Sequence, residues 1–194
     1  MPVAFEQFML PRTIVESDYL ISFTKMKTHH RAAVTLGMKN LFGCVPGCVY
    51  GFPKTRLHYA GTARVIADLA SIIQPDLTFI DAVVAMEGDG PLDGQPRPVG
   101  ALIAGENAAT TDAVTAQTMD FAPLLIPQFW YAMRKGLLRR PELFPAAPPT
   151  HRFAAPSNIA WIQGTASTSH NDQRTLCNRL LETGHAAQTA AAHA

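Results

Sequence analysis

Cations, imidazoles and small turn residues gather in one stretch of the sequence, between positions 25 and 58. The members that could contact a ligand are Lys27, His29, Lys39, Asn40, Gly43, Gly47 and His58. Lysine and histidine side chains can hold a carboxylate or a phosphate, and glycines let backbone amides approach such an anion. The stretch therefore predicts a pocket for a small anionic substrate or cofactor.

Within this stretch, Lys39 and His29 are the candidates for catalysis. A lysine can anchor an anion as a point charge, or act as a nucleophile where burial lowers its pKa. The alternative is a solvated surface, on which Lys25 and Lys27 are edge charges and His30 is an ordinary exposed residue.

A second group of candidates is acidic. Glu87 and Asp89 lie in the glycine-rich stretch Met86–Gly94, which follows an apolar segment. Paired carboxylates in such a place can bind a metal or move a proton, so both are predicted to be catalytic. The alternative is a turn in which Asp89 and Gly90 only satisfy the backbone geometry.

Cys44 and Cys48 are separated by Val-Pro-Gly and are candidate metal ligands. Two thiolates complete no common metal site, so His58 or His29 would have to join them. The alternative is that both are small apolar side chains near a turn. With Cys177 the chain has three cysteines, and an odd number argues against a disulfide framework.

The elements that must position these groups follow from the spacing of apolar residues. Strands are predicted over 18–24, 77–84 and 99–104, and helices over 35–42, 62–73, 108–119 and, in two pieces or with a late start, 123–138. This order predicts an α/β fold with a mostly parallel open sheet flanked by helices. The segments Tyr19–Phe23, Thr78–Val83 and Gly100–Ile103 should lie side by side in that sheet.

Two loops would then leave the sheet at the same edge. Lys25–His30 should lie just past the first strand, and Met86–Gly94 should be an irregular loop after the second. Because ligands bind beyond the carboxyl ends of parallel strands, the cations are expected to face the carboxylates across one crevice. In this arrangement Lys27, His29 and Lys39 oppose Glu87 and Asp89.

The composition limits the class of protein. Hydrophobic residues make up 47% of the 194 positions and charged residues 16%, which is typical of a globular domain or part of one. The formal net charge of +1 argues against a nucleic-acid partner. No apolar run reaches the roughly 20 residues of a membrane span, and the start lacks a signal peptide, so a cytoplasmic location without membrane contact is expected.

The chain is expected to divide near residue 140. Residues 1–140 read as the α/β domain, whereas 141–194 read as a proline-rich segment followed by an alanine-rich tail. A last edge strand is predicted over 158–163. The tail is expected to be largely disordered.

Three segments of the sequence resemble the domain of unknown function 362 family. They are Lys-Met-Lys-Thr-His at 25–29, Thr-Leu-Gly-Met-Lys-Asn-Leu-Phe-Gly-Cys-Val-Pro-Gly at 35–47, and the stretch 75–94 that ends Met-Glu-Gly-Asp-Gly-Pro-Leu-Asp-Gly. The resemblance spans roughly 13–138 and implies an α/β domain. Members normally have a further region of sheet and helices before the position of Asp18, so this chain looks like a truncated member with an incomplete domain.

Many members of that family carry, or sit beside, ferredoxin-like iron–sulfur modules. The resemblance therefore implies a redox association. The three cysteines here lack the repeated Cys-x-x-Cys spacing of a ferredoxin. A cluster would then belong to a ferredoxin-like partner or to a missing module, and the cofactor of this chain stays open.

A weaker resemblance concerns the order of His29, Lys39, Pro46-Gly47 and His58. It is similar to the pocket of the nickel-pincer lactate racemases, in which a lysine holds a pyridinium-derived cofactor and histidines carry protons. This likeness also implies a small anionic ligand.

Two functions remain open at this point. The first is a redox-linked enzyme or enzyme fragment that acts on a small anionic molecule. The second is a non-catalytic binding or scaffold module, or an inactive fragment. Self-association is expected in either case, because an incomplete sheet exposes an edge and an apolar surface.

Overall fold

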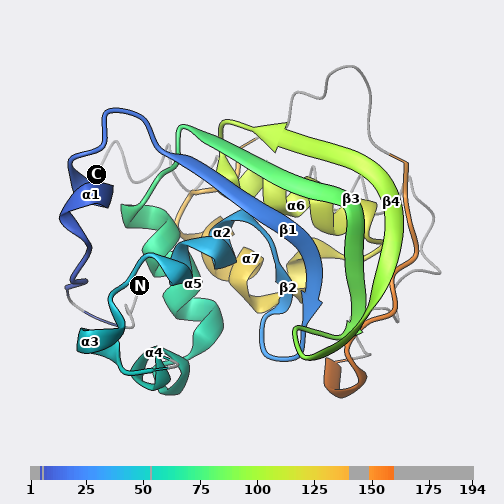
Figure 1. Cartoon of the computed structure of the whole chain (residues 1–194), viewed down its shortest axis with the longest axis horizontal. Coiled ribbons are helices and arrows are strands. Elements are labelled where there is room, and N and C mark those ends of the chain that lie inside the picture. The colour runs from blue at the N-terminus through green and yellow to red at the C-terminus, as the bar shows by residue number, and fades with distance from the viewer. Residues whose placement is uncertain (1–4, 6, 53, 140–148, 160–194) are drawn as a thin grey trace.

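The computed structural model describes residues 5, 7–52, 54–139 and 149–159. In this part of the chain, one sheet contains the strands β1 (Ile21–His29), β2 (Ala33–Thr35), β3 (Leu77–Asp89) and β4 (Asp93–Gly105), in the order β2-β1-β3-β4 (Figure 1). β1 pairs parallel with β3, and the other two pairings are antiparallel. The predicted α/β class and the three adjacent segments are confirmed, although the sheet is mixed rather than mostly parallel.

The antiparallel pairing of β3 with β4 corrects the prediction of an irregular loop over Met86–Gly94. Most of that stretch continues the two strands, which pair as far as Asp89 opposite Asp93. A parallel crossover needs a dozen or more residues, so the short connection can make only a hairpin. Gly90 and Gly94 allow close packing here, because a Cβ at Gly90 would lie 2.5 Å from the carbonyl oxygen of Thr28 and one at Gly94 would lie 2.4 Å from Cγ of Met86.

β1 is longer than predicted. The segment Lys25–His29 belongs to the strand instead of following it. Ser22, Thr24, Met26 and Thr28 are buried on one face of the sheet. The alternate residues, including Lys25 and Lys27, lie on the opposite and more open face, as the period of two in a strand requires.

The helices lie on the buried side of the sheet, and those at Gly47–Tyr50 and Thr55–Tyr59 lie beside the sheet rather than over it (Figure 1). The helices on this side are α2 (Gly37–Asn40), η1 (Leu41–Gly43), α3 (Gly47–Tyr50), α4 (Thr55–Tyr59), α5 (Thr62–Ile72), α6 (Ala108–Thr118), η2 (Pro123–Leu125) and α7 (Pro127–Arg134). The predicted helices over 62–73 and 108–119 are confirmed, as is the two-piece helix over 123–138. The helix predicted over 35–42 begins only at Gly37, because Thr35 belongs to β2.

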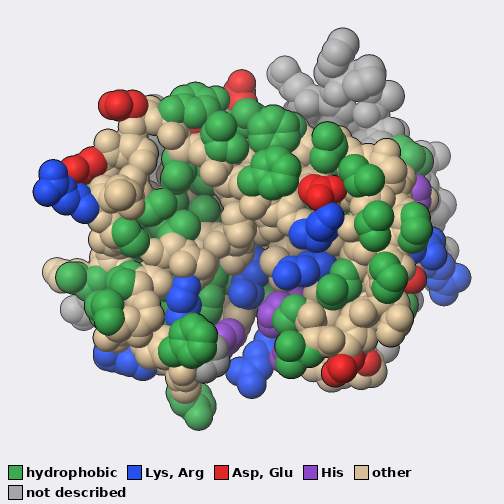
Figure 2. Space-filling view, in the orientation of Figure 1, with side chains coloured by type: hydrophobic (Ala, Val, Ile, Leu, Met, Phe, Trp, Pro, Cys, Tyr) green, Lys and Arg blue, Asp and Glu red, His purple; other side chains and the backbone are tan. Residues whose placement is uncertain are grey.

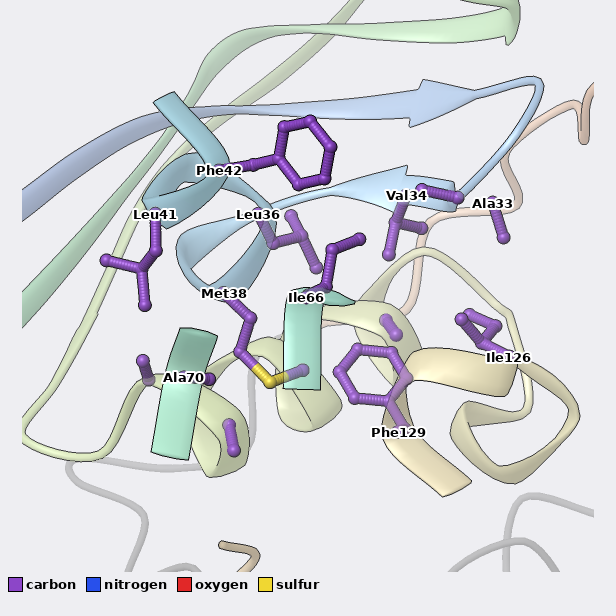
Figure 3. Close-up of a cluster of buried hydrophobic side chains, with 14 of the residues drawn as sticks. Ala33, Val34, Leu36, Met38, Leu41, Phe42, Ile66, Ala70, Ile126 and Phe129 are labelled. Carbon is purple, nitrogen blue, oxygen red and sulfur yellow. The ribbon is translucent and has the colours of Figure 1, made fainter. Parts of the chain in front are cut away.

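The hydrophobic core lies between the sheet and these helices. Figure 3 shows side chains of β2, α2, η1, α5 and α7 directed toward one another. The largest fully buried side chains are Phe121, Phe129, Phe153, Met26, Leu36, Met38, Leu41, Leu57, Ile66, Leu69, Ile80 and Met119. At roughly 1.5 to 3 kcal/mol for each buried side chain, this cluster dominates the stability of the domain.

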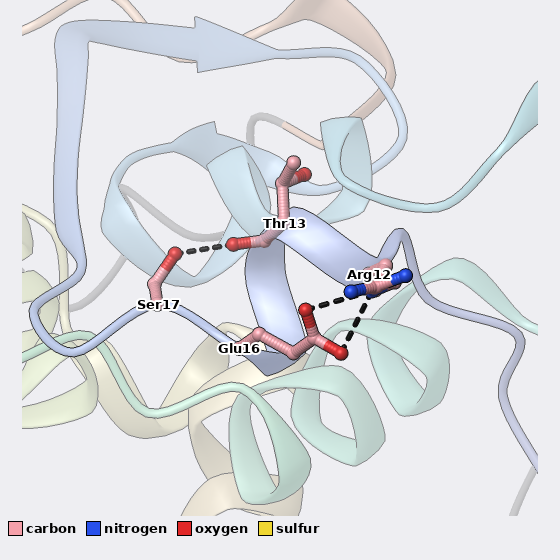
Figure 4. Close-up of polar contacts among 4 residues, drawn as sticks. All are labelled: Arg12, Thr13, Glu16 and Ser17. Carbon is pink, nitrogen blue, oxygen red and sulfur yellow. Dashed lines mark hydrogen bonds and ion pairs between the residues drawn. The ribbon is translucent and has the colours of Figure 1, made fainter.

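The helix α1 (Arg12–Val15) lies at the periphery. Nε of Arg12 donates to both carboxylate oxygens of Glu16, at 2.8 and 2.7 Å, and Oγ of Ser17 donates to the carbonyl of Thr13 (Figure 4). These groups are exposed, and exposed ion pairs contribute about 1 kcal/mol or less. α1 therefore contributes little to the position of any site.

Residues 149–159 run along the end of the β3–β4 hairpin. The amide of His151 donates to the carbonyl of Thr118, the amide of Gly88 donates to the carbonyl of Ala154, and Phe153 is fully buried in the core. This part of the proline-rich segment is therefore packed and not wholly on the surface. Residues 157–159 form a 3-10 turn, so the described start of the edge strand predicted over 158–163 is not a strand. The rest of that strand and the predicted tail lie outside the described residues.

Candidate basic site

The structure brings together basic side chains that the sequence singled out, and it adds Arg31 to them. We call Lys27, His29, His30, Arg31, Lys39 and His58 the basic cluster. They come from the end of β1, the turn into β2, α2 and α4, and their charges act on one another. Figure 2 shows Lys, Arg and His side chains lining a hollow on this face of the molecule.

The two lysines of the basic cluster are partly buried and have no described carboxylate partner. No ion pair in the described part of the chain involves Lys27 or Lys39. Nζ of Lys39 instead lies 4.4 Å from the centroid of the Phe42 ring. Burial, followed by the like charges of Lys27 and Lys54, lowers the pKa of Lys39 to about 8.

Lys39 is held in place by a contact between two helices. The carboxyl group of Asp112, in α6, accepts hydrogen bonds from the amides of Gly37 and Met38, each at 2.7 Å. It thus occupies the start of α2, where free amides need acceptors. Asp112 does not cap its own helix, because Asn107 does so by accepting from the amide of Thr110.

His29 is buried, and one of its ring nitrogens is already bonded. Nδ1 accepts hydrogen bonds from the amides of Arg31 at 3.0 Å and Ala32 at 3.4 Å. Burial and then the positive charge of Lys39, with smaller contributions from neighbouring basic groups, lower the pKa of His29 to about 3. The imidazole is therefore neutral at physiological pH.

His30 stacks on His29, with ring centroids 4.9 Å apart. Its Nδ1 lies 3.0 Å from the carbonyl oxygen of Gly90, to which its amide also donates. The side chain of Asn158 donates to the carbonyl of His30 at 2.8 Å. The turn between β1 and β2 is thus fixed by two distant parts of the chain.

His58 completes the basic cluster from α4. Its ring lies 5.1 Å from the Phe42 ring, and Nδ1 is 3.2 Å from Oγ1 of Thr62. Burial is the main cause that lowers the pKa of His58, followed by the charge of Arg31. Phe42 therefore lies against both Lys39 and His58.

The buried hydroxyl of Thr35 lies on the same side of the sheet as the side chain of Lys27. Thr35 in β2 pairs with Lys27 in β1, so both side chains leave on one face. Thr35 is 9% exposed, and its Oγ1 has no hydrogen-bond partner in the described part of the chain. Such an atom usually has a partner, because leaving it unpaired costs about 1 to 3 kcal/mol.

The predicted crevice between cations and carboxylates is not observed among the described contacts. Oε2 of Glu87 accepts from the amide of Ala154 at 3.0 Å, and Oε1 lies 3.7 Å from Arg97. Asp89 accepts from the amide and hydroxyl of Ser157, at 2.7 and 2.9 Å, and these bonds lower its pKa. Because β3 continues to Asp89, both carboxylates reach residues 149–159 and hold that segment.

Of the turn residues predicted to bind a cofactor, Asn40 and Gly43 are already hydrogen-bonded within the protein. Nδ2 of Asn40 donates to Oγ of Ser22 at 3.0 Å and to the carbonyl of Phe23 at 3.2 Å, so it fastens α2 to β1. The carbonyl of Gly43 accepts from Nζ of Lys54 at 2.7 Å. Gly47 begins α3, and a Cβ there would meet no atom within 4 Å.

The predicted metal ligands do not form a larger group. Cys44 and Cys48 are free thiols, and burial raises the pKa of Cys44. Among the residues that the structure describes, no three His, Cys, Asp or Glu side chains lie together as a metal site would require. The described residues thus supply no third ligand for the two thiols.

Comparison with known proteins decides the family. The model described as domain of unknown function (DUF362) matches residues 1–117. The chain belongs to the DUF362 family. A thylakoid-associated protein of Synechocystis sp. is 32% identical over 136 residues, or 69% of this chain and 42% of that protein. This DUF362 chain therefore spans less than half the length of the curated relative, and no solved structure matches it.

Sequence reasoning missed several residues at the site of this DUF362 chain. His30 was expected in a loop beyond the first strand, Arg31 was not considered, and Thr35 was assigned to a helix, whereas the chain turns at His30 and Arg31 into β2. Met26, an apolar residue between Lys25 and Lys27, was a signal for the longer strand. Across 5, 7–52, 54–139 and 149–159, we find no helix long and apolar enough to span a membrane.

Proposed function

We propose that the basic cluster of this DUF362 chain binds a small anionic molecule, either a substrate or a cofactor. The observation that carries the proposal is the pair Lys27 and Lys39, two partly buried ammonium groups without a described carboxylate partner. Each lost hydration on burial, and their like charges repel. A bound anion would offset both effects.

Each member of the basic cluster has a distinct role in this proposal. Lys27 in β1 and Lys39 in α2 each supply a positive charge to the anion. Neutral His29 supplies a directed hydrogen-bond donor, and the hydroxyl of Thr35 can accept or donate as the ligand requires. Arg31, which is exposed, would attract the anion from solvent.

Two features bear on whether the bound molecule also reacts. The lowered pKa of Lys39 leaves part of its population neutral near pH 8, which suits a nucleophile or a base. The resemblance to iron–sulfur-associated proteins supports a redox-linked enzyme or enzyme fragment, with electrons passed by a ferredoxin-like partner. A cytoplasmic location fits this reading, while the name of the Synechocystis relative supports a place beside thylakoids.

The second candidate is a non-catalytic binding or scaffold module. It is favoured by Glu87 and Asp89, because their oxygens accept hydrogen bonds from Ala154 and Ser157 and thereby hold residues 149–159. Asp89 acts electrostatically on His30, but no ion pair in the described part of the chain joins a carboxylate to Lys27 or Lys39. Absorption spectra and elemental analysis of protein purified without oxygen would reveal a bound cofactor and so favour the enzyme.

Titration calorimetry with inorganic phosphate tests the anion site. We expect the Lys39→Met variant to bind phosphate about tenfold more weakly or worse, because a charged contact is lost. Lys25→Met is the matched control, since Lys25 is already paired with Asp81 at 2.5 Å. Equal affinity in the wild type and in Lys39→Met, or no binding at all, would contradict the proposal.

A further inference from the structure

The two stacked imidazoles are fixed in opposite tautomers. Nδ1 of His29 accepts from backbone amides, so the proton of the neutral ring must be on Nε2. Nδ1 of His30 faces the Gly90 carbonyl, which can only accept, so this nitrogen carries a proton. In its neutral form, His30 therefore has an unprotonated Nε2.

The two Nε2 atoms are available to a ligand. No hydrogen bond within the described part of the chain occupies Nε2 of either histidine. The ring centroids are 4.9 Å apart and the planes differ by 20°. Two hydrogen bonds of about 2.8 Å each to one small anion can bridge rings at this separation.

We propose that the ligand of the basic cluster is an oxyanion that also carries a hydroxyl proton, with His29 as donor to an anionic oxygen and His30 as acceptor of that O–H. This inference rests on the proposed anion site and specifies its ligand. While His30 is neutral, a fully ionised oxyanion, which offers acceptors only, would leave Nε2 of His30 facing another lone pair. Discrimination of this kind is strong, because an unmatched buried polar group loses its hydrogen bond to water without gaining another.

Phosphate and sulfate are matched probes for the acceptor. They are tetrahedral and similar in size, but near neutral pH phosphate keeps at least one O–H, whereas sulfate has none. We expect calorimetry of the wild-type chain to give phosphate an affinity about tenfold or more above that of sulfate, and His30→Phe to abolish this preference by weakening phosphate binding. Phe keeps a ring to stack on His29. We expect His29→Phe to weaken both anions, and Lys25→Met to change neither.

Nitrogen NMR of protein labelled at histidine gives an independent readout. Long-range proton–nitrogen correlation should show a protonated Nε2 on His29 and, once His30 is neutral, a protonated Nδ1 on His30. The reverse assignment for either ring would overturn the inference. Equal affinity for phosphate and sulfate would also overturn the inference, but it would leave the proposed anion site supported. If neither anion binds, the proposed function fails as well.

Discussion

Oδ1 of Asp112 lies 2.7 Å from the amide nitrogen of Gly37, so a carboxyl group in α6 fixes the first residue of α2. Burial raises the pKa of Asp112 to about 8, although its bonds to the amides of Met38 and Gly37 lower it. The basic cluster depends on this contact because Lys39 is two residues further along α2. Stability and ligand binding should therefore respond to Asp112 together.

Replacing Asp112 with alanine should destabilise the domain. The change leaves two buried backbone amides without acceptors, which costs about 2 to 4 kcal/mol in the free energy of unfolding. Urea denaturation measures the loss, and phosphate titration should show weaker binding because α2 is no longer fixed. Asp18→Ala, at an exposed position, is the control. A loss no larger than that of the control would show that Asp112 is dispensable.

Gly37→Ala should be far more damaging than Gly43→Ala. A Cβ at Gly37 would lie 2.5 Å from Cγ2 of Thr78 and 2.9 Å from Oδ1 of Asp112, whereas a Cβ at Gly43 would meet nothing within 4 Å. Overpacking of this kind costs about 1 to 3 kcal/mol. Thermal unfolding of the two variants side by side measures the difference. Equal melting temperatures would mean that α2 can move away from Thr78 without loss.

Sulfate binding should weaken as the pH rises through about 8. Sulfate carries no proton in this range, so the change reports the protein. The ammonium of Lys39, whose pKa is about 8 in the free protein, loses its charge there. Affinity should fall up to about tenfold for each pH unit above that value. Lys39→Met should remove this dependence, and a wild-type profile that is flat from about pH 7 to about pH 9.5 would exclude Lys39 as the titrating group.

Acid should destabilise the domain partly through His29. The pKa of His29 in the folded protein is about 3, below the ordinary value of 6.5. Between these two pH values the unfolded chain therefore binds a proton at His29 and the folded chain does not. The stability from neutral His29 is present above pH 6.5 and is lost as the pH falls from there toward 3, by at most about 1.4 kcal/mol per pH unit. Urea denaturation of wild type and His29→Gln at several pH values isolates this contribution. Parallel curves would rule it out.

The open face of the sheet should mediate self-association. Ile21, Phe23 and Leu102 are at least half exposed there, around the ion pair of Lys25 with Asp81. A cation beside an anion is self-complementary under two-fold symmetry, so a second copy fits this face. Analytical ultracentrifugation should show a dimer that Phe23→Lys dissociates and Tyr59→Lys, on exposed α4, does not. A wild-type chain that remains monomeric at high concentration would argue against it.

Apolar spacing was sufficient to predict α5, because this helix buries Val65, Ile66 and Leu69 at helical intervals, but the short helices α1, α3 and α4 were missed. It failed for the β3–β4 hairpin, where glycine, proline and aspartate suggested a loop. Gly90 and Gly94 are needed there because neighbouring atoms leave no room for a Cβ. The sequence alone does not distinguish such glycines from those of a turn. The lysines and histidines of the site were found from their residue types, whereas Arg31 was not. The hydrogen-bond partners of Glu87 and Asp89 could not be predicted from the sequence, because they depend on where residues 149–159 fold back.

The parallel pairing of β1 with β3 has a consequence for the order of assembly. Lys25 and Asp81 are 56 positions apart in the chain, whereas β3 and β4 are joined by a short turn. Contacts between distant positions form late, since the loop between them must close first. The hairpin and α5 should thus form early. The basic cluster, which needs the end of β1 beside α2, should be among the last parts to acquire its native geometry.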